Sequence, residues 1–397
     1  MGSSVQAAPR KRVIWLQNSA DHYFVQMLDA LNSQGDVEYF GVFLCPPPQG
    51  NVLHQVPKIS PHVFLGEPAK PGNTGTPSHK TLGASARKFI EKLEFSAAIV
   101  GGYDSRFKRW VLRYCKSRGI HTAMFADSNI RAERGRSLKK RLKRFAKRFF
   151  LHRIIQQVDT VIPCNRCGVA YWRYYGCPAK KITRSTYYCA VDVPAALAVN
   201  RVELFARYRL DPDCKLIFTA ARLVPAKALH LMVEAFSKSG LADQGWIWAV
   251  AGDGPLRQEL ESQVAEQSRR AGTIRFLGAV APADIPPLMA QSELFVLPSI
   301  YEPHGIVVTE AMAVGTPVIA SRDCGAARDL VRNGKTGWLF QSGDTTKLTD
   351  ILLAAVRSES AQAEKSRGCK ARFIAWYARY GPLTVVPALA GKIKRGA

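Results

Sequence analysis

Residues 297–321 read LPSIYEPHGIVVTEAMAVGTPVIAS, and the organisation of the second half of the chain follows from this stretch. The apolar run Leu294–Leu297 predicts a buried strand, and Pro303 keeps the polar loop after it out of a helix. Residues Ile306–Val314 suit a helix, which a Gly-Thr-Pro triplet ends before a second strand starts at Val318. A strand, a helix and a further strand in this order indicate a parallel βαβ unit.

The start of this helix has the chemistry of an anion site. Gly305 allows a ligand to approach the backbone, and the amides of Ile306 and Val307 carry the positive end of the helix dipole. Two carboxylates, Glu302 and Glu310, stand on either side, and each can accept hydrogen bonds from a sugar diol. A nucleotide sugar fits this layout. The alternative is that both carboxylates are ordinary, one complementing the dipole and the other solvated in its loop.

Two cations precede this stretch at another turn from strand to helix. Arg222 and Lys227 follow the predicted strand Leu216–Ala220 and precede the predicted helix Leu231–Phe236. Both cations would lie at the same edge of the parallel sheet as the helix start. There they can neutralise a diphosphate and the charge that develops when it departs. Taken alone, Arg and Lys in a loop are usually surface charges.

The first half of the chain also alternates strands with helices, which predicts a parallel sheet. Ligands of such sheets lie beyond the carboxyl ends of the strands. The loops Gln17–His22, Gly101–Tyr103 and Ala126–Asn129 should therefore share a rim, with Asp21 and Asp127 on it. Residues 182–188 are expected to form the last strand of this half.

Length and charge narrow the class of protein. A chain of 397 residues predicts two domains, and no window is apolar enough to cross a bilayer. The first residues have no apolar core of a signal peptide. Residues 1–200 hold 31 Lys/Arg against 12 Asp/Glu, a net charge of +19, whereas the remainder carries +6. Such a field attracts nucleic acid, an anionic membrane or phosphorylated substrates.

The positive charge is densest in residues 131–153, where eleven Lys/Arg accompany one acid. Leu138, Leu142, Phe145, Phe149 and Leu151 recur at near-helical spacing, so a helix with an apolar stripe and a cationic face can lie on anionic lipid. The expected lipid contacts are Lys139, Lys140, Arg141, Lys143, Arg144, Lys147 and Arg148. Alternatively the stripe packs on the domain core. No nucleic-acid-binding motif accompanies the charge, so nucleic acid is not the expected partner.

The nine scattered cysteines suggest reduced thiols in a cytosolic protein. Cys164 and Cys167, with Cys177 and Cys189 downstream, have spacings that match no strong zinc pattern. We therefore expect no metal.

The segment EPHGIVVTE followed by AMAVGTPVIAS resembles the nucleotide-sugar motif of the family 4 retaining glycosyltransferases, although the better known form has Ser-Phe in place of Pro303-His304. The resemblance is strongest over residues 215–345. It implies an α/β GT-B fold, with two Rossmann-like βαβ domains facing across a cleft. The implied segments are an acceptor-side domain (1–192), a linker (193–213), a nucleotide-sugar-binding domain (214–371) and a C-terminal helix that packs back on the first domain (372–397).

The resemblance also implies roles for individual residues. Arg222, Lys227 and the amides after Gly305 would clamp the diphosphate, as the segment RLVPAK resembles the family's clamp. Glu310 would hold the ribose, and Glu302 would face the transferred sugar. His304 would contact the transferred sugar or, alternatively, only pack. The backbone near Val280 would face the nucleotide base. If the protein supplies a catalytic base or an oxocarbenium stabiliser, it would be Asp127 or Asp21.

The family mechanism is front-face, so the leaving diphosphate itself helps to deprotonate the acceptor and no enzymic base is strictly needed. No D-x-D triplet stands in a plausible donor loop, and Arg222, Lys227 and the helix can meet the charge of the diphosphate, so we expect no metal and no cofactor. We expect a retaining transferase that moves a sugar from a UDP- or GDP-sugar to a lipid-linked or polysaccharide acceptor, as in lipopolysaccharide assembly. It would be peripheral on the cytoplasmic face of the membrane. The alternatives are a soluble sugar-phosphate synthase of the same fold and a non-catalytic polyanion-binding protein.

Overall fold

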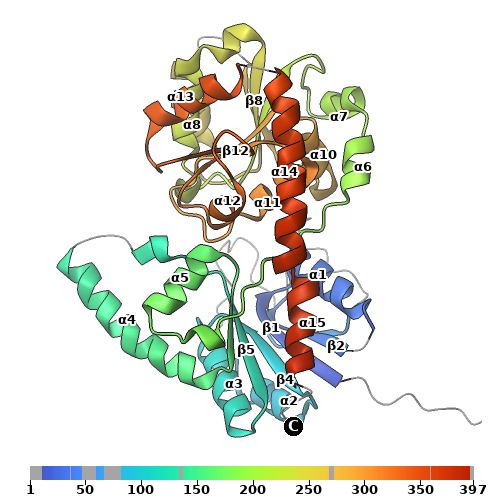
Figure 1. The fold of residues 1–397 in the computed structure, drawn as a ribbon, viewed down its shortest axis with the longest axis vertical. Helices are drawn as coiled ribbons and strands as arrows, with labels where there is room; N and C mark the ends of the chain where they lie inside the picture. The colour runs from blue at the N-terminus through green and yellow to red at the C-terminus, as the bar shows by residue number, and fades with distance from the viewer. Residues whose placement is uncertain are drawn as a thin grey trace, which may run out of the picture.

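The chain folds into two α/β domains, one above the other along the long axis of the molecule (Figure 1). The computed structural model describes residues 11–35, 37–46, 60–66, 82–133, 137–267, 272–357 and 359–393. Most of residues 46–77, whose many Pro, Gly and polar residues predict a loop, lie outside these ranges, as do the last four residues.

The first domain contains a parallel sheet in the order β3-β2-β1-β4-β5-β6. Its strands are β1 (Lys11–Ser19), β2 (Val37–Cys45), β3 (His62–Phe64), β4 (Ala97–Gly101), β5 (His121–Ala126) and β6 (Thr160–Pro163). Its helices are α1 (His22–Asn32), α2 (Ala84–Lys92), α3 (Arg106–Ser117), α4 (Leu138–Gln157) and α5 (Arg166–Tyr174). Both faces of the sheet are covered, since Ile14 packs into one core cluster and the neighbouring Trp15 into another.

The second domain repeats this plan in the order β12-β11-β10-β7-β8-β9. Its strands are β7 (Lys215–Ala220), β8 (Trp246–Ala251), β9 (Ile274–Gly278), β10 (Leu294–Leu297), β11 (Val318–Ser321) and β12 (Gly337–Phe340). Its helices are α6 (Val193–Ala198), α7 (Arg201–Arg207), α8 (Leu229–Ser239), α9 (Arg257–Gln267), α10 (Ile285–Ala290), α11 (Ile306–Val314), α12 (Gly325–Leu330), α13 (Thr345–Ala355) and α14 (Glu359–Tyr380).

In each sheet the chain order reverses between two central strands, β1 and β4 in the first domain and β7 and β10 in the second. A ligand site in such a sheet lies outside the carboxyl ends of the strands at this reversal. We call these two places the first-domain edge and the second-domain edge.

The segments that join the domains differ from the expectation in two places. Residues 193–213 are not a linker, because α6 and α7 bury Ala196, Leu204 and Phe205 in the core of the second domain. Residues 182–188 are not a strand either. Only Ile182 forms a bridge to β6, and the segment then turns to α14, where the amide of Thr186 donates to the carbonyl of Tyr380 at 2.7 Å.

The chain returns to the first domain at its end. Helix α14 packs along the second domain and buries Cys369 and Trp376 there, so the boundary expected at residue 372 falls inside this helix. After Gly381, α15 (Pro382–Ile393) buries Val385 and Val386 against the first sheet. The expected C-terminal helix that packs on the first domain is therefore α15. Figure 1 shows α14 beside the second domain and α15 beside the first.

Candidate active site

At the second-domain edge, the loops after β7 and β10 meet. The 3₁₀ turn Pro225–Lys227 follows β7, and the amide of Ile300 donates to the carbonyl of Ala226 at 3.0 Å. The ammonium of Lys227 forms an ion pair with the carboxylate of Glu302, and their side chains are 18% and 12% exposed. The structure thus brings together two residues that lie 75 positions apart in sequence.

Gly305 precedes α11 with φ +86°, a left-handed conformation that favours glycine. A Cβ at this position would lie 2.6 Å from the sulfur of Cys324, so packing also excludes a side chain. The first amides of α11, from Ile306 and Val307, have no acceptor within the helix. The amino end of α11 therefore presents free donors beside the Lys227–Glu302 pair.

Glu310 lies one turn inside α11 and is 5% exposed. It receives a hydrogen bond from the hydroxyl of Tyr23 in the first domain, while Oε2 has no hydrogen-bond partner among the described residues. Burial raises the pKa of Glu310 to about 7, and the bond from Tyr23 opposes this rise. An open cavity of about 470 Å³ lies between α1, α6 and α10, and Glu310 lines it.

Arg222 and Val280 are two further predicted donor contacts in this domain. Arg222 is exposed in the loop after β7. Val280 follows β9 and is buried in the domain core, so its side chain does not face a ligand and only its backbone can.

His304 lies in the interface between the domains. Its Nε2 is 3.2 Å from Oγ1 of Thr186, and its Nδ1 is 3.5 Å from Nδ2 of Asn165. Burial, with a smaller contribution from Arg184, lowers the pKa of His304 to about 3, so the imidazole is neutral near pH 7. Of the two interpretations of His304, this position favours packing over contact with the sugar.

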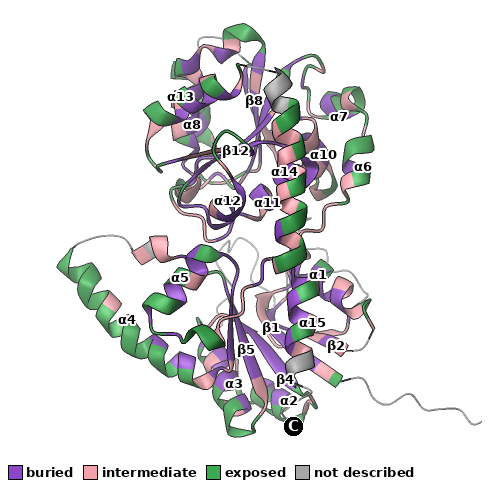
Figure 2. Ribbon diagram, in the orientation of Figure 1, coloured by how far each residue is buried: buried purple, intermediate pink, exposed green. Residues whose placement is uncertain are grey.

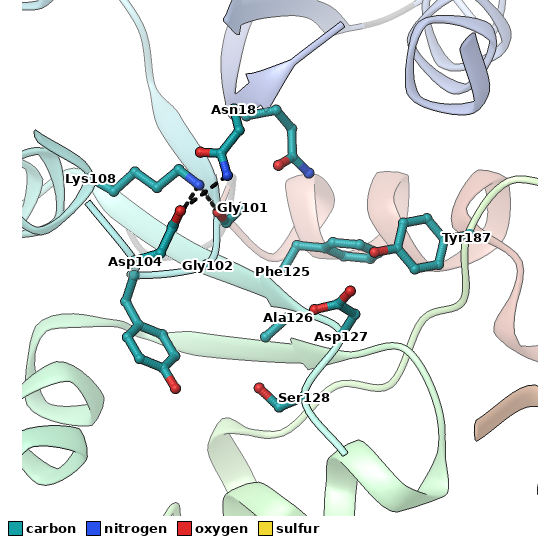
Figure 3. Close-up of a pocket in the computed structure, with 12 residues that line it drawn as sticks. Asn18, Gly101, Gly102, Asp104, Lys108, Phe125, Ala126, Asp127, Ser128 and Tyr187 are labelled. Carbon is teal, nitrogen blue, oxygen red and sulfur yellow. Dashed lines mark hydrogen bonds and ion pairs between the residues drawn. The ribbon is translucent and has the colours of Figure 1, made fainter. Parts of the chain in front are cut away.

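The first-domain edge holds a cavity of about 430 Å³, shown in Figure 3. The loops after β1, β4 and β5 share this rim, as the alternation of strands and helices predicts. Asp127 lines the cavity and accepts a hydrogen bond from Tyr187. Burial raises the pKa of Asp127. Asp21, the other candidate on this rim, caps α1 by accepting from the amide of Phe24 at 3.1 Å.

Sequence reasoning missed two charged residues of this cavity. Lys108 is 1% exposed, and its ammonium donates to the carbonyl of Gly101 and to Asp104, the latter at 2.8 Å. Asp104 also accepts from Nδ2 of Asn18 at 3.0 Å. The available signal was the position of Lys108 within the apolar stripe of α3, one turn before the buried Val111 and Leu112.

The two edges approach each other through the loop after β5. Nδ2 of Asn129 donates to the backbone carbonyl of Glu302 at 3.2 Å, and the charge of Glu302 acts on Asp127. Nδ2 of Asn165 donates to the carbonyl of Pro303 at 2.8 Å. The first-domain cavity therefore lies next to the Lys227–Glu302 pair.

The basic helix α4 projects from the first domain (Figure 1). Leu138, Leu142, Phe145 and Phe149 are 62–70% exposed, so the alternative in which the stripe packs on the core is wrong for these four residues. It holds for Leu151, the last residue of the stripe, which is buried in the core of the first domain. Figure 2 shows the exposure along most of α4. No helix in the described part of the chain has the length and hydrophobicity of a membrane span.

Arg144 and Lys147, which are among the seven expected lipid contacts on α4, both bind Glu133. Arg144 donates to the carbonyl of Glu133 at 2.8 Å, and Lys147 pairs with the carboxylate of Glu133. Both side chains are half-buried, and they fasten α4 to the turn before it. The other five are exposed: Lys139, Lys140, Arg141, Lys143 and Arg148.

The cysteines bear on the question of a metal. Cys164, Cys167 and Cys177 are buried, and Cys189 is half-buried. Among the described residues, no group of three or more His, Cys, Asp or Glu side chains is placed to hold a metal ion.

Residues 200–372 match the family model described as "Glycosyl transferases group 1". Among curated proteins, the α-D-kanosaminyltransferase of Streptomyces kanamyceticus is 29% identical over 176 residues, which are 44% of this chain and 45% of that protein. The chain spans about half the length of the curated relatives it matches.

Two solved structures share the fold over nearly the whole chain. Anabaena HepE in complex with UDP-glucose has a TM-score of 0.71 at 16% identity and covers 97% of this chain and 99% of its own. The sucrose-phosphate synthase from Thermosynechococcus elongatus has a TM-score of 0.75 at 18% identity, again covering 97% and 99%. The GT-B fold expected from the sequence is confirmed.

Proposed function

From the match of residues 200–372 to the group 1 glycosyltransferase model, we propose that the protein transfers a sugar from a nucleotide-diphosphate sugar to an acceptor with retention of configuration. The observation that carries this proposal is the second-domain edge. Here the loops after β7 and β10 bring together a helix amino end, the ion-paired Lys227 and Glu302, and a buried Glu310, one oxygen of which has no hydrogen-bond partner among the described residues.

The diphosphate would lie against the amino end of α11, where the amides of Ile306 and Val307 point outward. Arg222 and Lys227 would supply positive charge to it, with Lys227 exchanging part of its contact with Glu302 for a phosphate oxygen. Glu302 would then be released to accept from a hydroxyl of the transferred sugar. These cations meet the charge of the leaving group, so the proposed reaction needs no metal.

At the nucleotide end, the unpartnered oxygen of Glu310 would accept from a ribose hydroxyl. The backbone near Val280 would face the base. Tyr23 holds the other carboxylate oxygen, so the first domain would contribute to the nucleotide site.

In the reaction, the departing diphosphate would take the proton of the acceptor hydroxyl on the face from which it leaves. Asp127 stands on the opposite edge, near Glu302. As an anion it would stabilise positive charge that develops on the sugar ring, and burial there strengthens such an interaction.

A thermal-shift screen against UDP-, GDP- and ADP-sugars tests the proposed donor class. Saturation at a hundredfold excess over Kd stabilises a protein by about 2.7 kcal/mol, so one nucleotide class should raise the melting temperature clearly. Glu310→Ala should abolish the increase, and Glu266→Gln, a change at an exposed carboxylate on α9, should leave it intact. If no nucleotide sugar stabilises the wild-type protein, the proposed function is wrong.

We further propose that α4 holds the enzyme on the anionic cytoplasmic face of a membrane, where it would glycosylate a lipid-linked or polysaccharide acceptor. The support is the exposed apolar row beside exposed cations. Each Lys or Arg near an anionic surface contributes about 1 kcal/mol of binding.

A vesicle flotation assay with phosphatidylserine-containing liposomes tests this attachment. Neutralising Lys139, Lys140, Arg141 and Lys143 should release the protein, as should Phe145→Ser combined with Phe149→Ser. The control neutralises four exposed cations on α2 and α3, namely Lys88, Lys92, Arg113 and Lys116, and should float like wild type. Equal flotation of all variants would refute the membrane role.

A further inference from the structure

The first-domain cavity has a charge opposite to that of the domain around it. Residues 1–200 carry a net charge of +19, yet the ionisable groups that line the cavity are Asp104, Asp127, Lys108 and two tyrosines. Burial raises the pKa of both Tyr103 and Tyr187, so these rings stay neutral. Among the described residues that line the cavity, two carboxyl groups therefore accompany one ammonium, and burial raises the pKa of one of these carboxyls, Asp127.

The single cation of the cavity is already engaged. Lys108 is almost fully buried and donates to Asp104 and to the carbonyl of Gly101, as Figure 3 shows. A phosphate entering the cavity would have to compete with Asp104 for this ammonium while lying close to Asp127. Repulsion of this kind, in a partly desolvated site, excludes an anion.

The same groups suit a neutral ligand that is rich in hydroxyls. Asp104, Asp127 and Asn18 supply acceptors, and the Oδ1 atom of Asn18 is buried without a hydrogen-bond partner in the described part of the chain. Phe125 and Tyr187 supply apolar ring surface beside them. A few polar groups among aromatic side chains are typical of a small-molecule site.

Glycine at position 101 helps to form this wall. A Cβ there would lie 2.0 Å from Oε1 of Gln17, so a larger residue would displace Gln17 from the cavity lining. The cavity lies close to the donor domain, because Asn129, two residues beyond the cavity-lining Asp127, donates to the backbone carbonyl of Glu302 at 3.2 Å. A hydroxyl held here would therefore face the transferred sugar.

We propose that this cavity receives a neutral, hydroxyl-rich sugar ring of the acceptor, and that Asp104 and Asp127 exclude a ring that carries phosphate or carboxylate. The inference rests on the proposed function, because it treats the cavity as the acceptor half of a glycosyl transfer. Any negative charge of the acceptor would then lie outside the cavity, on the part of the acceptor that faces solvent or the membrane.

Cysteine labelling measures the cavity directly and does not require a known acceptor. Ser128 lines the cavity, and Ser128→Cys introduces a thiol there, while the native cysteines are buried or half-buried. We compare the rates at which a cationic reagent, trimethylammonium-ethyl methanethiosulfonate, and an anionic one, sulfonato-ethyl methanethiosulfonate, modify this thiol. Each rate is divided by the rate at which the same reagent modifies a small free thiol. The background rate of the wild-type protein is subtracted.

We expect the cationic reagent to be favoured at Ser128→Cys. Adding Asp104→Asn and Asp127→Asn should lower the cation-to-anion rate ratio by about tenfold or more, since both carboxyl groups of the cavity lining are removed. The control is Ser117→Cys, which is exposed between Lys116 and Arg118 and should favour the anionic reagent. A cavity thiol that favours the anionic reagent would overturn the proposal.

Protection from labelling tests the ligand class. Methyl glycosides of neutral hexoses at high concentration should slow modification of Ser128→Cys, whereas glucose 6-phosphate and glucuronate at the same concentration should not. Protection by the anionic sugars alone, or by no neutral glycoside, would contradict the proposal. Failure of wild-type protein to bind any nucleotide sugar would instead refute the proposed function, and it leaves the labelling result unchanged.

Discussion

The two edges have the same strand order but opposite chemistry. The second-domain edge combines Lys227 and Arg222 with the positive end of the α11 dipole. The first-domain edge combines Asp104 and Asp127 with a lysine that is already neutralised. The difference shows that the net charge of a domain does not predict the charge of its site. In the proposed reaction the cationic edge takes a diphosphate and the other edge takes hydroxyls.

The proposed reaction requires that the two edges stay opposite each other. A buried carboxylate that joins the two domains contributes to this arrangement. The side chain of Asp329 on α12 is fully buried, and it accepts from Nε of Arg166 at 3.0 Å and from the guanidinium of Arg184. Both arginines precede the second domain in sequence. Asp329 therefore joins the domains beside the interface that holds His304.

The largest effect should follow from Asp329→Ala. It leaves Arg184, whose side chain is 11% exposed, without its carboxylate, and breaking a buried pair in this way costs about 3 kcal/mol. We expect a loss of this size in the free energy of unfolding in urea, together with lower turnover. Glu234→Ala breaks an exposed pair with Lys238 and should cost less than about 1 kcal/mol. Equal losses in the two variants would show that Asp329 does not hold the edges together.

A second prediction removes charge from the cationic edge alone. Arg222 is exposed, so Arg222→Ala should leave the unfolding free energy within about 0.5 kcal/mol of wild type. If it stabilises the departing diphosphate, kcat should fall about a hundredfold, the usual loss of one preorganised charge-stabilising group. Arg222→Lys should restore part of the rate, because lysine returns the positive charge but lacks the planar guanidinium that can donate two parallel hydrogen bonds. Lys335→Ala removes an exposed cation away from this edge and serves as the control. Wild-type kinetics in Arg222→Ala would remove this residue from the site.

The two edges also differ in how far sequence predicts them. The bounds of β10 and α11 agree with those expected, because apolar periodicity and the Gly and Pro residues that interrupt it are local signals. The pairing of Lys108 with Asp104 depends on how α3 packs, and the contact of Tyr23 with Glu310 depends on how two domains dock. Residues 182–188 have the composition of a strand, but composition does not reveal that the amides of Thr183 and Ser185 donate to β6 while that of Thr186 donates to α14.

The smallest expected effect concerns pH at Glu310, the group of the second-domain edge that the first domain touches. Burial raises its pKa to about 7, so below this pH the carboxyl is protonated and loses acceptor capacity. If a ribose diol binds there, nucleotide affinity should fall about tenfold between pH 8 and pH 6, as measured by calorimetry. Glu310→Gln should bind more weakly at pH 8 and show no such pH dependence.

Stability should change with pH in the opposite direction. The folded pKa of Glu310 lies above its unfolded value, so the folded state holds a proton that the unfolded state releases. The resulting stabilisation is complete below the unfolded pKa and disappears as pH rises toward about 7. Glu310→Gln should flatten this part of the unfolding profile, whereas Tyr23→Phe, which removes the bond that lowers the pKa, should extend it to higher pH. A nucleotide affinity that does not change with pH, combined with a stability that does, would mean that Glu310 belongs to the domain interface and not to the donor site.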